Sequence, residues 1–538
     1  MGGVPSKKLG VNCSESSVTA INQVDGIQIA THNDAYDYYM TKLSQEVLKI
    51  QLLLAAEDLP KSCNPIAVVF MRTSKGELKE IDRTEVPKKS RCPVWIHPVY
   101  IFYNPNAKQP ELVFHLYDVD RKYLKDPVNR LKLGEQTFMG KIEHQFLTEL
   151  IAADGFSKFT LSKDAQERDV GTLIVSVEKT VPPTQAVEMV FRCSKMVNKD
   201  PYLRISRIKK GNKYAIHETK LAKNNLNPTW ESTHLTLQDF HSKENSLMIE
   251  CFDYNANGKH KLIGEIRTCV ANLEILHNNK RGVHFLAGHK TLEAQIFVDS
   301  CTEKPVYRFS DYLENNFQLE FIFAVDLTAS SRDSSHQLDA YPQVISEVGK
   351  SIGSLNFDKR FPAWGFGGGV QIGNVISHCF NLDESLGETE VEETKGVLSA
   401  YLHAREKITL ASPASTRFSE VITKAAKHAS SKSSCDKTKY SVLLIITAGV
   451  HADIKETKDA LIEASECPLS ILIIGVNGAD CKQMEILEAE HKILRFVSWS
   501  ELQGGKDIDI KQLFSKLPEQ FLEYMKSKGI RPRSNKKC

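Results

Sequence analysis

The first residues of the chain have a pattern that could carry a lipid. Residues 1–6, MGGVPS, fit the rule for N-myristoylation at Gly2, and Lys7 and Lys8 follow directly. The alternative is an ordinary flexible tail that begins with glycine, because so short a pattern also occurs by chance. One acyl chain holds a protein on a membrane only marginally, so an acylated chain would need a second membrane contact.

A basic segment, residues 121–134, is a candidate for that second contact. It carries five positive residues against one negative, a net charge of +4, and the cations are Arg121, Lys122, Lys125, Arg130 and Lys132. Each cation near anionic lipid contributes about 1 kcal/mol. The apolar residues between them could dip into the membrane interface, namely Tyr123, Leu124, Leu131 and Leu133. The alternative is a solvated, mobile insertion, since charge runs are usually that.

A weaker basic pattern follows at residues 204–213 and continues to Lys220 and Lys223. Its cations alternate along an extended stretch and include Lys209 and Lys210, a pattern that could bind phosphoinositide head groups. Exposed strands also carry lysine simply to discourage edge pairing, so both interpretations stay open.

The sequence lacks the common catalytic motifs. It has no G-x-x-x-x-G-K-[ST], no H-E-x-x-H and no G-x-S-x-G. Its 12 cysteines include no C-x-x-C, which excludes a RING or a zinc ribbon and favours reduced thiols. The glycines of residues 365–369 precede extended apolar residues rather than a helix, so they are interpreted as a flexible turn. We therefore expect no enzyme, no small-molecule substrate and no nucleic-acid partner.

The composition indicates a soluble, globular protein of several domains. The chain has 538 residues, which corresponds to about three or four domains. Lys+Arg total 69 against 67 for Asp+Glu, 25% of residues are charged and 41% are hydrophobic. This balance excludes a disordered chain, and no apolar run approaches the roughly 20 residues of a membrane span.

An internal duplication organises the first 300 residues. Residues 93–95 match 228–230 at an offset of 135, and residues 117–120 match 252–255 at the same offset. Residues 138–141 match 262–265 at an offset of 124, so the first copy has about eleven extra residues, which we expect to form a loop. Apolar and polar residues alternate in both copies, at 112–117 and 247–252, and the runs 172–180 and 292–300 close them. The pattern predicts two antiparallel β-sandwiches.

After Cys301 the pattern changes to buried strands alternating with helices. Apolar runs at 317–326, 440–447 and 469–476 are typical of a parallel sheet that is covered on both faces. The segments between them favour helices at 337–355, 393–407, 419–432 and 455–466. This alternation predicts an α/β doubly wound domain, whose ligand site lies beyond the carboxyl ends of its strands, where Asp326 stands.

In this order the three domains resemble a copine, in which two C2 domains precede a von Willebrand factor A domain. Matching segments are residues 83–86, 223–228, 309–312, 324–330, 361–367 and 523–532. The resemblance covers nearly the whole chain and implies that the C2 pair brings the protein to phospholipid in response to calcium, while the A domain engages partner proteins. Some members of the family are myristoylated, which adds weight to the signal at Gly2.

The resemblance also implies calcium sites at one end of each C2 domain. Calcium takes six to eight oxygen ligands, and affinity follows the number of charged ones. In the first copy the matching acids are Asp58, Asp118 and Asp120, with Asn64 and Thr137 nearby, so a calcium site there is an open hypothesis. The second copy keeps Asp200 and Asp253 but has Lys261 where a ligand is expected, so we interpret that site as degenerate. The calcium response is therefore expected to be weakened.

In the A domain the resemblance implies a metal-ion-dependent adhesion site for Mg²⁺ or Mn²⁺. Asp326, Thr328 and Ser330 match its D-x-[ST]-x-S loop, and Thr416 matches its second loop. The acid of the third loop is missing, because Ala448 stands there. Asp453 is near this position but off the pattern, and we interpret it as the cap of the helix that begins before Lys455.

Together these patterns predict five segments and one function. The segments are a flexible, acylated residues 1–40, C2 domains at 41–180 and 181–300, an A domain at 301–530 and a basic tail at 531–538. We expect a cytoplasmic adaptor, peripheral on the inner face of the plasma membrane, that binds acidic phospholipid through its C2 domains and protein partners through its A domain. The alternative is a soluble cytosolic scaffold that depends on neither lipid nor metal.

Overall fold

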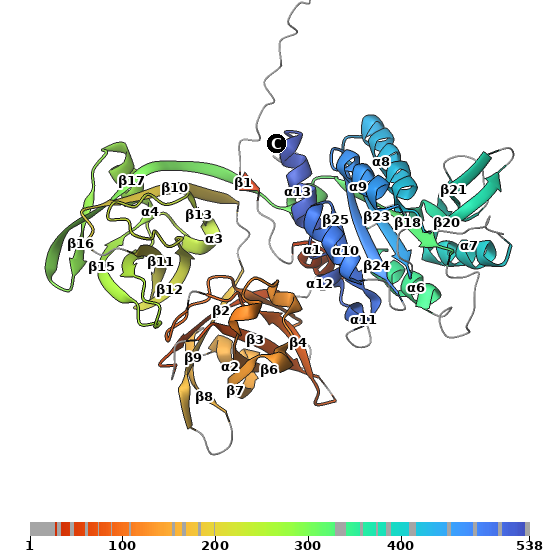
Figure 1. Ribbon diagram of the computed structural model, residues 1–538. Coiled ribbons are helices and arrows are strands. Elements are labelled where there is room, and N and C mark those ends of the chain that lie inside the picture. The colour runs from red at the N-terminus through yellow and green to blue at the C-terminus, as the bar shows by residue number, and fades with distance from the viewer. Residues whose placement is uncertain are drawn as a thin grey trace, which may run out of the picture. The chain divides into compact units, whose positions relative to one another are not determined.

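The computed structural model describes most of the chain. The described residues are 27–28, 34–43, 48–59, 63–73, 75–87, 89–106, 109–152, 156–163, 168–180, 184–197, 200–328, 340–353, 355, 359–372, 375–383, 389–407, 416–448, 453–476, 481–503 and 508–532. Gly2, Ser330 and residues 533–538 of the predicted tail lie outside them. The contacts divide the chain into two compact units: one is Ala35–Tyr307, and the other is Arg308–Cys538 together with Met1–Asp34 (Figure 1).

The first sandwich consists of two four-stranded layers. Hydrogen bonds connect its strands in the order β4-β3-β6-β7-β8-β9-β2-β5, and the two layers meet through the single residue pair Lys141–Ser162 between β7 and β8. Its elements are β2 (Leu48–Glu57), β3 (Pro65–Arg72), β4 (Leu78–Arg83), β5 (Val99–Tyr103), β6 (Glu111–Asp118), β7 (Thr137–Phe146), α2 (Leu147–Ala152), β8 (Phe156–Ser162) and β9 (Arg168–Lys179).

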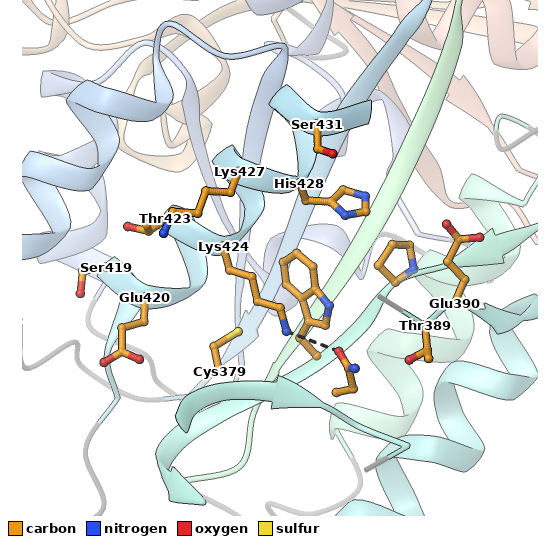
Figure 2. Close-up of a pocket in the computed structure, with 13 residues that line it drawn as sticks. Cys379, Thr389, Glu390, Ser419, Glu420, Thr423, Lys424, Lys427, His428 and Ser431 are labelled. Atoms are coloured by element: carbon orange, nitrogen blue, oxygen red, sulfur yellow. Dashed lines mark hydrogen bonds between the residues drawn. The ribbon is translucent and has the colours of Figure 1, made fainter. Parts of the chain in front are cut away.

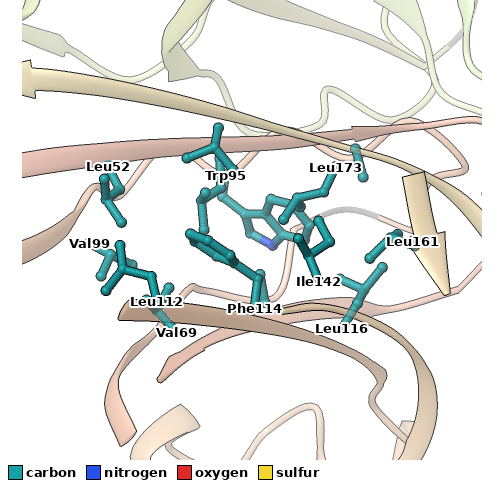
Figure 3. Close-up of a cluster of buried hydrophobic side chains, with 14 of the residues drawn as sticks. Leu52, Val69, Trp95, Val99, Leu112, Phe114, Leu116, Ile142, Leu161 and Leu173 are labelled. Carbon is teal, nitrogen blue, oxygen red and sulfur yellow. The ribbon is translucent and has the colours of Figure 1, made fainter. Parts of the chain in front are cut away.

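A continuous apolar core lies between these layers. Trp95 and Phe114 are each 1% exposed and pack among aliphatic side chains from both layers, including Leu52, Leu116 and Leu173 (Figure 3). Alternate residues of β6 point into this core, as the period-2 pattern predicts. The buried apolar area stabilises the sandwich, and the opposite faces of the strands are left for other contacts.

The second sandwich repeats this topology strand for strand. Its order is β12-β11-β14-β15-β16-β17-β10-β13, which confirms that the duplication in the sequence is a duplication of fold. The strands are β10 (Gln185–Ser194), β11 (Pro201–Lys209), β12 (Asn212–Glu218), β13 (Thr233–Thr236), β14 (Leu247–Asp253), β15 (Lys261–Thr268), β16 (Val283–Ala287) and β17 (Lys290–Tyr307), and the helices are α3 (Leu237–Phe240) and α4 (Val270–Asn278).

Two predicted boundaries differ from the structure. Residues 34–43 form a helix, α1 (Asp34–Leu43), so the segment predicted as flexible up to residue 40 already contains ordered structure. The last strand of the second sandwich, β17, continues to Tyr307, seven residues beyond the predicted boundary at 300. Its pairing with β10 reaches Pro305, which explains the extension.

The second unit contains a doubly wound α/β domain with a six-stranded sheet. The strand order is β21-β20-β18-β23-β24-β25, parallel throughout except for the antiparallel pair β20–β21. The strands are β18 (Gln318–Asp326), β20 (Ala363–Ile372), β21 (Val375–Asn381), β23 (Lys439–Thr447), β24 (Leu469–Gly475) and β25 (Leu494–Ser498). The short strands β1 (Ile27–Gln28), β19 (Arg360–Phe361) and β22 (Val391–Glu392) lie outside this sheet.

Helices cover both faces of this sheet (Figure 1). The helices of this unit are α5 (Phe309–Glu314), α6 (Ala340–Ile352), α7 (Glu393–Lys407), α8 (Phe418–Cys435), α9 (Ile454–Ala464), α10 (Cys481–Glu490), α11 (Trp499–Leu502), α12 (Ile510–Leu513) and α13 (Leu517–Ser527). Ile322 and Ala324 of β18 pack with side chains of α8, α9 and α10, whereas Phe321 on the other face lies 6.2 Å, ring to ring, from Phe514. None of the described helices is long and apolar enough to cross a membrane.

One local interpretation was wrong. Residues 365–369 do not form a flexible turn, because they lie inside β20, whose pairing with β21 shifts register between Phe366 and Val370. Gly367 adopts a φ of +110° at this irregularity, a conformation that only glycine takes up without strain. The glycines therefore shape a strand that lies next to Asp326.

Candidate metal and lipid sites

Asp326 is the centre of a buried cluster of oxygen atoms in the α/β domain. It ends β18 beside the end of β23, where the strand order of the sheet reverses, and its side chain is fully buried. Its Oδ1 accepts a hydrogen bond from Thr328 N at 2.9 Å. Its Oδ2 accepts from Thr416 Oγ1 at 3.1 Å and from Thr447 Oγ1 at 2.7 Å. The structure thus brings Asp326, Thr328 and Thr416 together and adds Thr447, which the sequence pattern did not reveal.

The backbone around this cluster fits it closely. Thr328 Oγ1 donates to Gly367 O at 2.7 Å, and a Cβ at Gly367 would lie 2.1 Å from Thr328 Oγ1 and 2.5 Å from Asp326 Oδ1. A side chain at that position would therefore displace the cluster. At the position of the missing acid, Ala448 N donates to Tyr341 OH at 2.9 Å.

The donor set fits a hard divalent cation. Burial raises the pKa of Asp326, and hydrogen bonds from Thr328, Thr447 and Thr416 lower it in part. Thr328 Oγ1 and Thr416 Oγ1 lie 3.3 Å apart, close to the roughly 3.0 Å that separates adjacent oxygens around Mg²⁺ with bonds of about 2.1 Å. Magnesium keeps several waters and needs few protein ligands, so one carboxylate with hydroxyls is an adequate set.

Asp453 is the N-cap residue of α9, as predicted, but its side chain does not cap that helix. Its carboxylate instead accepts hydrogen bonds from the first amides of α8, Phe418 N at 3.1 Å and Ser419 N at 3.0 Å. Thr457 Oγ1 donates to it at 3.1 Å. Since Thr416 lies two residues before the start of α8, Asp453 fixes the segment that carries Thr416 and acts as a positioning residue.

In the first sandwich the predicted calcium ligands lie at one end of the domain. Asp58 follows β2, and Asp118 at the end of β6 pairs with the first residue of β3. Asp118 Oδ1 accepts from Asn64 N at 2.8 Å, and Asp120 Oδ1 accepts from Lys122 N at 3.0 Å. These acids therefore already hold the backbone of the loops. Calcium binding by this domain stays a prediction.

In the second sandwich the remaining acids also stabilise loops. Asp200 Oδ1 accepts from Asn224 N at 2.9 Å, and Asp253 Oδ1 accepts from Asp200 N at 3.3 Å. The strand register places Lys261 directly opposite Asp253. Over the described ranges of the chain, no three acidic, histidine or cysteine side chains come together to hold a metal. The weakening of a calcium site in the second sandwich stays a prediction.

The basic segment 121–134 forms an anchored loop, which we call the basic loop. It consists of three short 3-10 turns, Arg121–Tyr123, Val128–Arg130 and Leu133–Glu135. Arg83 holds it from β4, because its Nη1 donates to Val128 O at 3.1 Å and to Leu131 O at 2.6 Å. Gln136 joins its two ends, donating to Lys132 O and accepting from Asp120 N.

The cationic and the apolar side chains of the basic loop differ in their exposure to solvent. The five cations are all exposed, and Lys132 has 80% of its side-chain surface in solvent. Leu124 is 44% exposed, but Leu131 is only 4% exposed and packs against Ile66 and Val119. The prediction that Leu131 dips into the membrane was therefore wrong, since this side chain anchors the loop. The sequence alone could not distinguish the two leucines, because both stand between cations.

The basic strands of the second sandwich are largely paired with acids. Arg207 Nη2 lies 2.6 Å from Glu178 Oε2 and Lys209 Nζ lies 3.1 Å from Glu178 Oε1. Arg204, Lys213 and Lys220 also form ion pairs with glutamates. Because a paired cation must give up its partner to bind a phosphate, this face is a poorer lipid site than the basic loop. Lipid binding by Lys209 and Lys210 stays a prediction.

A pocket that the sequence did not predict lies between α8 and the pair β20–β21 (Figure 2). Its volume is about 590 Å³. Lys424 Nζ lies 4.5 Å from the centre of the Trp364 ring and donates to Asn381 Oδ1 at 3.4 Å. His428 Nε2 lies 3.0 Å from Glu320 Oε2, and both side chains are buried. None of the Asp326 cluster lines this pocket, so it is a separate feature of the domain.

Two C2-type sandwiches followed by a von Willebrand factor A-type domain define a class of multidomain proteins, and comparisons give the family. The C2 domain model matches residues 41–157 and 185–286, and the Copine model matches residues 333–533. The chain is 37% identical to Protein BONZAI 1 of Arabidopsis thaliana, over 93% of this chain and 94% of that protein. It is 36% identical to Protein BONZAI 2 of the same plant, over 94% of each. The chain belongs to the copine family, as its sequence resemblance predicts.

Solved structures also match parts of the chain. One is titled BON1-C2B, is 36% identical, covers 23% of this chain and 93% of its own, and has a TM-score of 0.22. Another contains the two C2 domains of Extended-Synaptotagmin 2 with calcium bound, is 15% identical, covers 48% of this chain and 96% of its own, and has a TM-score of 0.17.

Proposed function

We propose that this copine-family chain is a membrane adaptor without catalytic activity. Its first C2 domain attaches to acidic phospholipid, and its A domain recruits a protein partner. The basic loop carries the proposal, because Arg83 and Leu131 hold it in place while its cations point into solvent. An ordered cationic loop loses less conformational entropy on binding than a mobile one would.

Calcium has a minor role in this proposal. The acids at the loop ends of both C2 domains accept hydrogen bonds from backbone amides, and Lys261 faces Asp253 in the second domain. Cations of the protein supply the positive charge that bound calcium would otherwise provide. Myristoylation at Gly2 would add the second contact that stable anchoring requires and would keep the protein at the inner face of the plasma membrane.

The Asp326 cluster supports partner recruitment by the A domain. Asp326, Thr328 and Thr416 would hold Mg²⁺ or Mn²⁺, and the bound ion would offer an open position to a carboxylate of the partner. Gly367 and Asp453 keep these side chains in place. The loss of an acid at Ala448 lowers the negative charge of the site and is expected to weaken metal affinity.

Sedimentation of the full chain with vesicles tests the lipid half of the proposal. We expect pelleting with phosphatidylserine-containing vesicles to the same extent in calcium and in chelator, and little pelleting with neutral phosphatidylcholine vesicles. Pelleting that requires calcium would contradict the proposed role of the basic loop. A chain that stays soluble with every vesicle would favour the cytosolic scaffold instead.

A further inference from the structure

The outer edge of β21 in the A domain is open to strand pairing. β21 is the last strand of its sheet, and none of the described segments pairs with its other side. Leu382 N donates to Ala363 O at 2.9 Å, which fixes the register of the pairing with β20. Because backbone groups alternate in direction along an antiparallel strand, Cys379 and Asn381 direct theirs away from β20. An unpaired edge of this kind is a template for an extended chain.

The pocket between α8 and the pair β20–β21 lies beside this edge. Cys379 and Asn381 both contribute to its lining, and its volume of about 590 Å³ is within the range of ligand sites. The opposite wall is α8, which contributes Thr423, Lys424 and Lys427 (Figure 2). An extended chain paired with β21 places every second side chain on the face of the sheet that carries this pocket. One ligand can therefore pair with the strand edge and fill the pocket at the same time.

The buried groups of the pocket suit binding rather than chemistry. His428 Nε2 lies 3.0 Å from Glu320 Oε2, and Ser441 Oγ donates to the same oxygen at 3.0 Å, so these polar groups satisfy one another. Burial raises the pKa of Cys379 to about 12, so its thiol stays protonated at neutral pH and is a poor nucleophile. The deep part of the pocket is therefore a fixed surface, and its specificity depends on the charges near the opening.

Those charges favour one acidic side chain in the ligand. Lys427 is exposed, and none of the described residues forms an ion pair with it; Lys424 lies one turn before it on α8. Of the two acids in the lining, Glu390 lies 2.9 Å from Lys432 Nζ and is neutralised by it. The other acid, Glu420, lies on the first turn of α8, away from Glu390 (Figure 2). The middle of the groove is therefore cationic and its end at the start of α8 is acidic, which disfavours a run of acids.

We propose that the groove between α8 and β21 binds an extended segment of a partner protein. The segment pairs with the free edge of β21 as an added strand and places one acidic side chain at Lys424 and Lys427. A second copy of this chain is a poorer occupant, because two β21 strands paired about a twofold axis would bring two sets of the same cations together. The groove is separate from the Asp326 cluster, so this contact goes beyond the metal-dependent recruitment proposed above and needs no metal.

The test selects a library of random displayed peptides on the full chain in chelator and measures the selected peptide by fluorescence anisotropy. We expect β-branched sequences with one acidic residue. Lys427→Gln should weaken binding about fivefold, the upper end for an exposed ion pair, and Lys427→Glu should bind better when the acid of the peptide is replaced by lysine. The control Lys437→Gln removes an exposed lysine beyond the end of α8, more than about 10 Å from Lys427 along the helix axis, and should change nothing.

Methylation of the backbone amides of the peptide, one at a time, tests the strand pairing. Every second methyl group should cost about fivefold, because it removes one hydrogen bond to β21, and the methyl groups between them should cost little. No enriched peptide, no alternation, or equal losses in Lys427→Gln and Lys437→Gln would overturn the proposal. Binding that Asp326→Asn abolishes would assign the peptide to the metal site, and a dimer of the chain that the peptide dissociates would identify a second copy as the occupant; either result would overturn it as well. Failure of magnesium to bind at Asp326 would contradict only the metal-dependent recruitment.

Discussion

Neutralising two cations of the basic loop should weaken membrane binding about 30-fold. Lys125 and Lys132 are both exposed. Within the described part of the chain, the one ion pair that either lysine makes is between Lys132 and Glu135, which lie 3.7 Å apart at the surface. The double change Lys125→Gln, Lys132→Gln should therefore leave the fold intact. Each cation near anionic lipid contributes about 1 kcal/mol, so the pair contributes about 2 kcal/mol, or roughly 30-fold in the partition coefficient.

The matched control removes the same charge from the far end of the same domain. Lys75 and Lys79 are exposed beside the turn between β3 and β4, and the eight residues of β3 separate this turn from the loop end. At about 3.3 Å per residue the separation is roughly 25 Å, well beyond the screening length of about 8 Å at physiological ionic strength. Lys75→Gln with Lys79→Gln should therefore change binding less than twofold.

The assay is sedimentation of the full chain with phosphatidylserine vesicles over a range of lipid concentrations in chelator. The difference between the two double variants should shrink in 0.5 M salt, because salt screens exposed charges. Equal losses in both variants would show that net charge alone matters. Unchanged binding in the loop variant would refute the reasoning outright.

Three further predictions concern the A domain. Asp453→Ala removes the acceptor of two α8 amides and should cost about 1–2 kcal/mol, seen as a melting temperature several degrees lower; an unchanged melting temperature would contradict its positioning role. Magnesium or manganese at ten times its Kd should stabilise the wild-type chain by about 1.4 kcal/mol in thermal denaturation, and it should not stabilise the Asp326→Asn variant. Equal shifts of the melting temperature in the two proteins would exclude this site. Burial opposes ionisation of Glu488, but Arg495 and Lys516 outweigh it and lower the pKa of Glu488 from 4.5. A carboxylate with a lowered pKa stabilises the fold above about pH 4.5, and this stability is lost as the pH falls below that value. The free energy of unfolding in urea should therefore differ less between pH 7 and pH 4 in the Glu488→Gln variant than in the wild type.

The repeat and the hydrophobic periodicity were sufficient to predict the fold. The strands at 317–326, 440–447 and 469–476 begin and end within one residue of β18, β23 and β24, because buried parallel strands are continuous apolar runs. The helix predicted at 393–407 coincides with α7. Residues 365–369 were misread because glycine marks both turns and irregular strands, and only the partner strand distinguishes them.

The sites were less predictable because they depend on which partner each side chain meets. Asp326 and Thr416 follow from the spacing of the family motif, but Thr447 joins them through the pairing of β18 with β23, which a linear motif does not contain. The cations of residues 204–213 looked available in the sequence, whereas most of them meet glutamates of distant segments. The anchoring role of Leu131 likewise depends on Ile66, 65 positions away in the chain.

Hydrogen–deuterium exchange of the full chain on vesicles tests the central claim most directly. With phosphatidylserine vesicles in chelator, peptides that cover residues 121–134 should exchange more slowly than in the free chain, and neutral vesicles should leave them unchanged. A chain that pellets with acidic vesicles while residues 121–134 exchange at their free rate would contradict the account, because another surface would then carry the attachment.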